Sequence, residues 1–126
     1  DRQAVVDHFV RLFRVLGSPD VVTPEAELRL RIAQAAERGF YPVGTLRQML
    51  AVMADSPRAA LLAQIKAPTL VFHGRDDPLL PYACGEDTAR RIPGARLIGV
   101  AGMGHDLPAP VVERLLVALR PHFQSV

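Results

Sequence analysis

The feature that most constrains how this chain can fold is a change of pattern after Pro68. Two short apolar runs follow it, at residues 69–73 and 96–100, and both are rich in residues that favour β-strands. The segment from Pro81 to Ile92 between them is predicted to be a helix that opens with its proline. Strand, helix and strand over about 32 residues have the size of one βαβ unit, with parallel strands and a right-handed crossover. The sequence therefore predicts an α/β fold.

The half of the chain before Pro68 shows helical periodicity and no strand signal. Its apolar residues recur at steps of three and four, which places them on one face of each helix. Thr23 is predicted to cap the second helix, with Pro24 as its first residue, and Gly39 to end it. We expect helices over residues 1–16, 24–38, 43–54 and 57–65, and a strongly apolar last helix over 111–120.

Composition and charge exclude several classes of protein. The formal net charge is only +2 and the arginines are interleaved with acidic residues, so we expect no binding of nucleic acid. No apolar run approaches the roughly 20 residues that a membrane span requires, so we expect no membrane segment. Cys84 is the only cysteine, which rules out an internal disulfide or a multi-cysteine metal cluster. A reducing, cytoplasmic setting is therefore expected.

Two carboxylates, Asp76 and Asp77, follow the first predicted strand. In open α/β sheets, ligands bind beyond the carboxyl ends of the strands. An Asp that precedes Pro also commonly starts a turn, so a structural role stays open for this pair. The alternative is that one of the two carboxylates accepts a hydrogen bond from an imidazole and stabilises the imidazolium that forms during proton transfer.

His105 follows the second predicted strand within the motif Gly-Met-Gly-His-Asp. The unperturbed pKa of an imidazole, about 6.5, suits a general base that later acts as general acid. A lone histidine is more often structural, and we expect this of His73, but an acid and a base after two neighbouring strands favour a catalytic pair. Asp76, Asp77, His105 and Asp106 lack the spacing of metal ligands, and the nearby glycines lack that of a dinucleotide-binding loop. We therefore expect neither a metal nor a cofactor.

These motifs resemble the α/β-hydrolase superfamily. Residues 67–81, with the motif His-Gly-Arg-Asp-Asp-Pro, are similar to the strand and loop that carry the triad acid, and the resemblance makes Asp77, three residues after the glycine, that acid. Residues 93–105 are similar to the last strand and the catalytic histidine loop, which makes His105 the base. Residues 39–62, together with Gly-Met-Gly-His-Asp-Leu-Pro, are most similar to esterase-like members such as the aclacinomycin methylesterase group.

The resemblance implies a division of the chain. Residues 1–55 would be a helical cap or lid segment, and residues 56–126 the C-terminal portion of the α/β-hydrolase core. The superfamily orders its triad as serine, acid and histidine, yet no Gly-x-Ser-x-Gly motif occurs here. The serines of the chain are Ser18, Ser56 and Ser125. We therefore expect the nucleophile and the oxyanion-hole loop to lie upstream, in an N-terminal half that this C-terminal piece lacks.

The resemblance further implies a serine hydrolase, most simply a carboxylic ester hydrolase that acts on a small-molecule ester without a cofactor. Asp77 would orient His105, and His105 would deprotonate the upstream serine. This chain alone is expected to be inactive. Four apolar side chains of the cap segment are candidates to line an acyl or aromatic pocket, although core packing would explain them equally well: Phe40, Tyr41, Met49 and Met53.

Other functions stay open at this stage. The chain could be a truncated or proteolytic fragment that acts only by association, or belong to a peptidase, a haloalkane dehalogenase or a cofactor-free haloperoxidase, because a fold does not determine a chemistry. Two parallel strands belong in a larger sheet, and an apolar strand edge without its partner pairs with another chain. We therefore expect association with the missing N-terminal half, or self-association.

Overall fold

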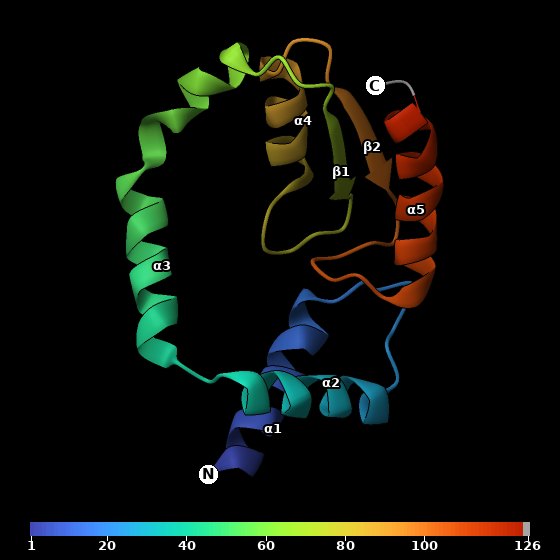
Figure 1. The fold of residues 1–126 in the computed structure, drawn as a ribbon. Coiled ribbons are helices and arrows are strands. Elements are labelled where there is room, and N and C mark those ends of the chain that lie inside the picture. Colours follow the sequence, from blue (N-terminus) through green and yellow to red (C-terminus); the bar gives the residue numbers. More distant parts are fainter. Residues whose placement is uncertain (125–126) are drawn as a thin grey trace.

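The computed structural model of the protein describes residues 1–124, apart from the side chains of residues 56 and 57 (Figure 1). Helices come first, and a strand, a helix, a second strand and a last helix follow them, as predicted. In chain order the elements are α1 (Arg2–Leu16), α2 (Glu25–Arg38), α3 (Pro42–Ala54), the 3₁₀ helix η1 (Ser56–Gln64), β1 (Leu70–Gly74), α4 (Tyr82–Arg91), β2 (Arg96–Val100) and α5 (Ala109–Gln124).

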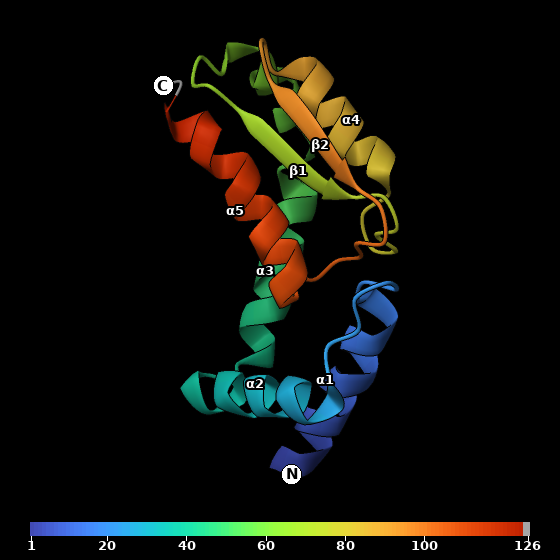
Figure 2. The same ribbon diagram turned by 90° about the vertical axis from the view of Figure 1, so that its right-hand side faces the viewer.

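The two strands form a parallel sheet, in which Leu70 lies opposite Arg96 and Gly74 opposite Val100. Helix α4 covers one face of the sheet and α5 the other, as Figure 2 shows. Apolar residues from β2, the loop after it and α5 form a buried cluster: Val100, Met103 and Val111. The predicted α/β class is therefore confirmed, and the structure is that of a partial α/β-hydrolase fold.

Helices α1 and α2 pack against each other around a second buried cluster, made of Val6, Val10 and Ile32. The side chain of Asp1 caps α1 by accepting a hydrogen bond from the backbone N–H of Gln3 at 3.0 Å. Helix α3 then runs along the left of Figure 1, from this helical pair to η1, and none of its residues is buried. The described chain thus has two separate apolar clusters, one in the helical pair and one between β2, the loop after it and α5.

The start of α2 differs from the prediction. The helix begins at Glu25, Pro24 occupies the cap position, and no side chain caps the first turn, so the predicted Thr23 cap is wrong. The carbonyl oxygen of Thr23 accepts a hydrogen bond from the guanidinium of Arg14 at 2.8 Å. This contact fixes Thr23 in the loop between α1 and α2, one residue before the cap position of α2.

Helix α5 is longer than the predicted 111–120 at both ends. It can start before Pro110 because the first-turn amides of a helix have no acceptor within the helix, so a proline there removes no bond. With 16 residues it is the longest helix of residues 1–124. None of the helices in that range is long and apolar enough to cross a membrane.

Candidate active site

The ends of β1 and β2 lie side by side, and the loops that follow them meet at the carboxyl edge of the sheet. The register pairs Gly74 with Val100, so the chain leaves both strands at the same level. Beyond the sheet, the N–H of Asp76 donates to the carbonyl oxygen of Met103 at 3.1 Å. A side chain at Gly74 would overlap the carbonyl oxygens of the opposite loop, so a glycine is needed there for the loops to approach.

This geometry brings Asp77 and His105 together. The carboxylate oxygen Oδ2 of Asp77 lies 2.7 Å from Nδ1 of His105. The other oxygen, Oδ1, accepts the backbone N–H groups of Leu79 and Leu80, each at 2.8 Å. The Asp77 side chain is only 6% exposed, whereas that of His105 is 38% exposed. The acid is therefore enclosed and fixed from two sides, and the imidazole lies between it and solvent.

The protonation states follow from this environment. Burial of the Asp77 carboxyl acts to raise its pKa, but the hydrogen bonds from Leu80, His105 and Leu79 outweigh that effect, and the pKa is lowered below the ordinary 3.8. At neutral pH Asp77 is thus a carboxylate, which can only accept hydrogen bonds. Nδ1 of His105 must then be the donor in this contact, and Nε2 is the nitrogen that can accept a proton when the ring is neutral. This is the tautomer that a general base requires.

Asp76 has a different role. Its Oδ2 accepts the backbone N–H of Gly102 at 2.7 Å, so the side chain braces the histidine loop from the neighbouring loop. Gly102 has a φ of +72°, in the left-handed region that favours glycine. A side chain at this position would also overlap Asp20.

His73 lies at the end of β1, next to the acid. Its Nε2 is 2.9 Å from the carbonyl oxygen of Leu80 and 3.8 Å from Oδ2 of Asp77. Because a carbonyl only accepts, Nε2 of His73 is the donor in the shorter contact. The ring also packs edge-on against Tyr82. His73 therefore holds the turn that supplies backbone donors to Asp77, which agrees with its prediction as a packed residue.

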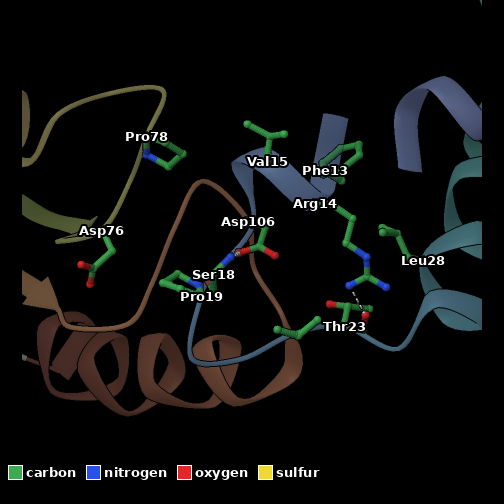
Figure 3. A pocket seen from close by; sticks show the side chains of 12 residues that line it. Phe13, Arg14, Val15, Ser18, Pro19, Thr23, Leu28, Asp76, Pro78 and Asp106 are labelled. Atoms are coloured by element: carbon green, nitrogen blue, oxygen red, sulfur yellow. Dashed lines mark hydrogen bonds between the residues drawn. The ribbon is translucent and has the colours of Figure 1, made fainter. Parts of the chain in front are cut away.

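The end of α1 holds the histidine loop from the other side. The N–H of His105 donates to the carbonyl oxygen of Leu16 at 2.7 Å, and the N–H of Gly104 donates to Oγ of Ser18 at 3.0 Å. The backbone N–H and the hydroxyl of Ser18 both donate to Oδ1 of Asp106, at 2.8 and 2.5 Å. Figure 3 shows Ser18 and Asp106 beside a cavity of about 300 Å³, which lies between the end of α1 and the loops after the two strands.

Sequence reasoning missed Ser18 and Asp106. They are 88 positions apart, and no local pattern links a serine after a helix to a carboxylate that distant. The one usable signal was Gly104, a glycine beside a candidate base, which indicates a close backbone approach. A side chain there would overlap the backbone of Gly17 and Leu16.

A cavity of about 370 Å³ opens beside His105. Its apolar walls come from the two strand-end loops and β1, and include Phe72, Leu80, Met103 and Leu107. The four predicted pocket residues lie elsewhere, on α3 and just before it, with exposed side chains: Phe40, Tyr41, Met49 and Met53. Among them, Phe40 packs edge-on against Phe9 of α1. Within residues 1–124, no group of three His, Cys, Asp or Glu side chains is placed to hold a metal ion.

A parallel βαβ unit with an imidazole–carboxylate pair at the carboxyl edge of its strands has the architecture of the α/β-hydrolases. Residues 47–113, more than half of the chain, match the model of the family described as TAP-like protein (Abhydrolase_4). The chain belongs to this family of α/β-hydrolases.

The curated relatives include methyl esterases. The chain is 30% identical over 124 residues to rhodomycin D methylesterase DnrP of Streptomyces peucetius, a match that covers 98% of this chain and 41% of the relative. It is 32% identical over 106 residues to a pimeloyl-(acyl-carrier protein) methyl ester esterase of Nitrosomonas europaea, covering 83% of this chain and 40% of the relative. The chain thus spans about two fifths of the length of these relatives.

Two solved structures share the fold. A serine hydrolase involved in carbazole degradation (CarC enzyme) superimposes with a TM-score of 0.71 at 17% identity, over 96% of this chain and 48% of its own. A variant of a meta-cleavage product hydrolase (CumD) superimposes with a TM-score of 0.68 at 18% identity, over 96% of this chain and 46% of its own. At such low identity these likenesses bear on the fold alone.

Proposed function

We propose that this chain carries the acid and the base of a Ser-His-Asp triad in a carboxylic ester hydrolase. Asp77 is the acid and His105 the base. The observation that carries the proposal is their 2.7 Å contact, made by a carboxylate that is otherwise held by two backbone N–H groups. The two relatives, a methylesterase and a methyl ester esterase, support an ester as the substrate class.

The catalytic serine belongs, in this proposal, to a part of the protein outside this chain. Ser18 is unsuited to the role, because it is 3% exposed and its hydroxyl is engaged with Asp106 and Gly104. This chain corresponds to about two fifths of the length of its relatives, so in the proposal the nucleophile belongs to a segment that corresponds to the rest of their length. Residues 1–55 would act as the cap, and residues 56–126 as the part of the core that delivers the acid and the base.

The chemistry follows from the tautomer of His105. Nε2 takes the proton of the serine hydroxyl while the serine oxygen bonds to the ester carbonyl carbon, and the carboxylate of Asp77 stabilises the imidazolium. The proton then passes to the departing alkoxide, which leaves as the alcohol. A water molecule, deprotonated by the same Nε2, attacks the acyl-enzyme; the bond from the acyl carbon to the serine oxygen breaks, the proton passes from Nε2 to that oxygen, and the carboxylic acid is released. The cavity beside His105 accommodates an apolar part of a small ester.

The test compares ester hydrolysis by this chain and by a longer protein that contains it, with p-nitrophenyl acetate as substrate. We expect the 126-residue chain to show no turnover above buffer, because none of its serines stands in a Gly-x-Ser-x-Gly motif that would present it to the pair. In the longer protein, His105→Ala should lower kcat by about 10³-fold or more. His8→Ala is the matched control, because His8 lies on α1 with an exposed side chain, and it should leave kcat unchanged.

Two results would overturn the proposal. One is turnover by the 126-residue chain that co-elutes with it in gel filtration and disappears in His105→Ala. The other is a longer protein in which His105→Ala and His8→Ala have the same activity.

A further inference from the structure

The loop that carries His105 is held by a segment 88 positions away in the sequence. Leu16, Ser18 and Asp20, which end α1 and follow it, form hydrogen bonds with every residue of the loop from Gly102 to Asp106 except Met103. We call residues 16–20 the α1 end segment. Its partners lie directly before, at and after the candidate base.

Ser18 is the centre of this contact. Its hydroxyl accepts the N–H of Gly104 and donates to Oδ1 of Asp106, so both of these hydrogen bonds are to the two neighbours of His105. Ser18 is also buried, its bond to Asp106 is partly buried, and a hydrogen bond to a carboxylate is stronger than one between neutral groups. Removing the hydroxyl would leave the N–H of Gly104 without an acceptor in a buried place.

Among the described residues, the side chain that anchors the imidazole of His105 is that of Asp77. The direction in which its ring leaves the backbone is therefore set by residues 104–106, and that backbone is held by the α1 end segment on one side and by Asp76 on the other. A shift of about 1 Å at such a site is enough to cost a large part of the activity of an enzyme.

We propose that Ser18 is a positioning residue for His105, which acts through Gly104 and Asp106 and ties the orientation of the base to the α1–α2 helical pair. The catalytic part of this inference rests on the proposed function. The hydrogen bonds from Ser18 to Gly104 and Asp106 do not depend on it, because they are present in the described chain. A movement of the helical pair is transmitted to the imidazole by the hydrogen bonds of Ser18. The state of the helical pair thereby controls whether the His105–Asp77 hydrogen bond is formed.

The test follows the proton on Nδ1 of His105 by NMR, in the protein labelled with ¹⁵N at histidine and assigned with His105→Gln. In the native protein this proton lies between two atoms 2.7 Å apart, and we expect it to exchange slowly with water. In Ser18→Ala we expect its exchange to be faster by about tenfold, the effect of one lost hydrogen bond. The control is Thr88→Ala, which removes a hydroxyl bonded to the Cys84 carbonyl within α4, away from the loop, and should leave the exchange rate unchanged.

A second pair of variants covers the case in which Ser18→Ala does not fold. Asp106→Asn keeps an oxygen acceptor for Ser18 and should retain slow exchange, whereas Asp106→Ala removes the acceptor and should accelerate it about tenfold. Folded Ser18→Ala, or folded Asp106→Ala, with native exchange of the Nδ1 proton would overturn the proposal.

Kinetics separate this inference from the proposed function. In a longer protein that hydrolyses esters, Ser18→Ala should lower kcat about tenfold and leave KM unchanged, because the ester still binds. If no ester is hydrolysed but the Nδ1 proton still exchanges faster in Ser18→Ala, the proposed function fails and the positioning role stands. Equal kcat for Ser18→Ala and Thr88→Ala would overturn the positioning role.

Discussion

Asp76 and Asp77 are adjacent and chemically identical, yet their surroundings separate their roles. Asp77 directs one oxygen at an imidazole and the other at two backbone N–H groups. Asp76 directs its carboxylate at the backbone of the histidine loop, where it accepts the N–H of Gly102. The first arrangement stabilises a charge that appears on His105 during a reaction, and the second stabilises a loop.

This difference predicts unequal effects of two equivalent substitutions in a longer, active protein. Asp77→Asn should lower kcat by about 10⁴-fold, because the imidazole loses the carboxylate that sets its tautomer. Asp76→Asn should lower kcat by less than about tenfold, because the amide oxygen can still accept the N–H of Gly102. Initial-rate kinetics check both, with thermal melts to show that the variants fold. Small and equal effects on kcat would mean that Asp77 only supports a turn.

The lowered pKa of Asp77 predicts how stability depends on pH. A carboxyl whose folded-state pKa lies below its unfolded value stabilises the native state above the unfolded pKa, and loses that effect as the pH falls through the folded pKa. The free energy of unfolding of the native protein should therefore exceed that of Asp77→Asn at pH 7, and the difference should shrink below about pH 4. Urea titrations at pH 7, 4 and 3 measure it. A difference that does not vary with pH would contradict the assignment.

Local sequence signals were sufficient to predict where Asp77 and His105 lie. Each follows an apolar strand of five residues, and parallel neighbouring strands bring their carboxyl ends together. No such signal predicted Ser18 and Asp106, because their hydrogen bonds depend on how α1 docks on a loop 88 positions away. The assignment of Asp77 and His105 to catalysis stays a prediction.

At the scale of elements, α5 buries some of its apolar side chains against the rest of the protein and leaves others exposed to solvent. Its first-turn residue Val111 is 1% exposed and completes the cluster with Val100 and Met103, whereas Val117 on the same helix is 71% exposed. The two valines thus have the same side chain and the same helical backbone but opposite surroundings. Their comparison isolates the contribution of burial.

Val111→Ala should lower the free energy of unfolding by about 2 kcal/mol, through the loss of buried methyl groups and the cavity that remains. Val117→Ala should change it by less than about 0.5 kcal/mol, because the side chain is already in water. Denaturant titrations of both variants measure these values. Equal losses would show that α5 does not pack on the sheet through Val111.

The sequence predicted the elements better than it predicted their ends. Helical periodicity, with the prolines and glycines at helix ends, predicted the helices, and short apolar runs predicted the two strands; β1 is displaced by only one residue from the predicted 69–73. The start of α2 was wrong because the Arg14 contact at the Thr23 carbonyl is made between two parts of the chain. Helix α5 extends two residues before the predicted 111–120 and four beyond it; Pro110 in the first turn removes no bond, and at the other end the helix continues past Pro121.

At the scale of the whole molecule, residues 1–124 contain two apolar clusters and a two-strand sheet with two unpaired edges. The residues of β1 that carry its apolar character, Leu70, Val71 and Phe72, have no charge that would prevent pairing with another chain. Several large apolar side chains of α3 are exposed as well, among them Leu46 and Met53. Such a surface is suited to a partner that covers it.

We therefore expect the 126-residue chain to associate with itself at micromolar concentration, and to become monodisperse when the N-terminal part of a longer protein is supplied in trans. Light scattering over a concentration series, with and without that part, measures the mass. A stable monomer with a sharp cooperative melt would show that the strand edges need no partner.

The ring that the described chain forms in Figure 1 has a consequence for the order of folding. Residues paired between β1 and β2 are 26 positions apart in the sequence. Ser18 and Asp106, which are joined by hydrogen bonds, are 88 positions apart, so their contact closes a much longer loop. The entropy lost on closing a flexible loop grows with its length, so the shorter closure is the easier one. The strands and the helical pair are thus expected to form first, and the ring to close last. The orientation of His105 would then be among the final features of the native state to appear.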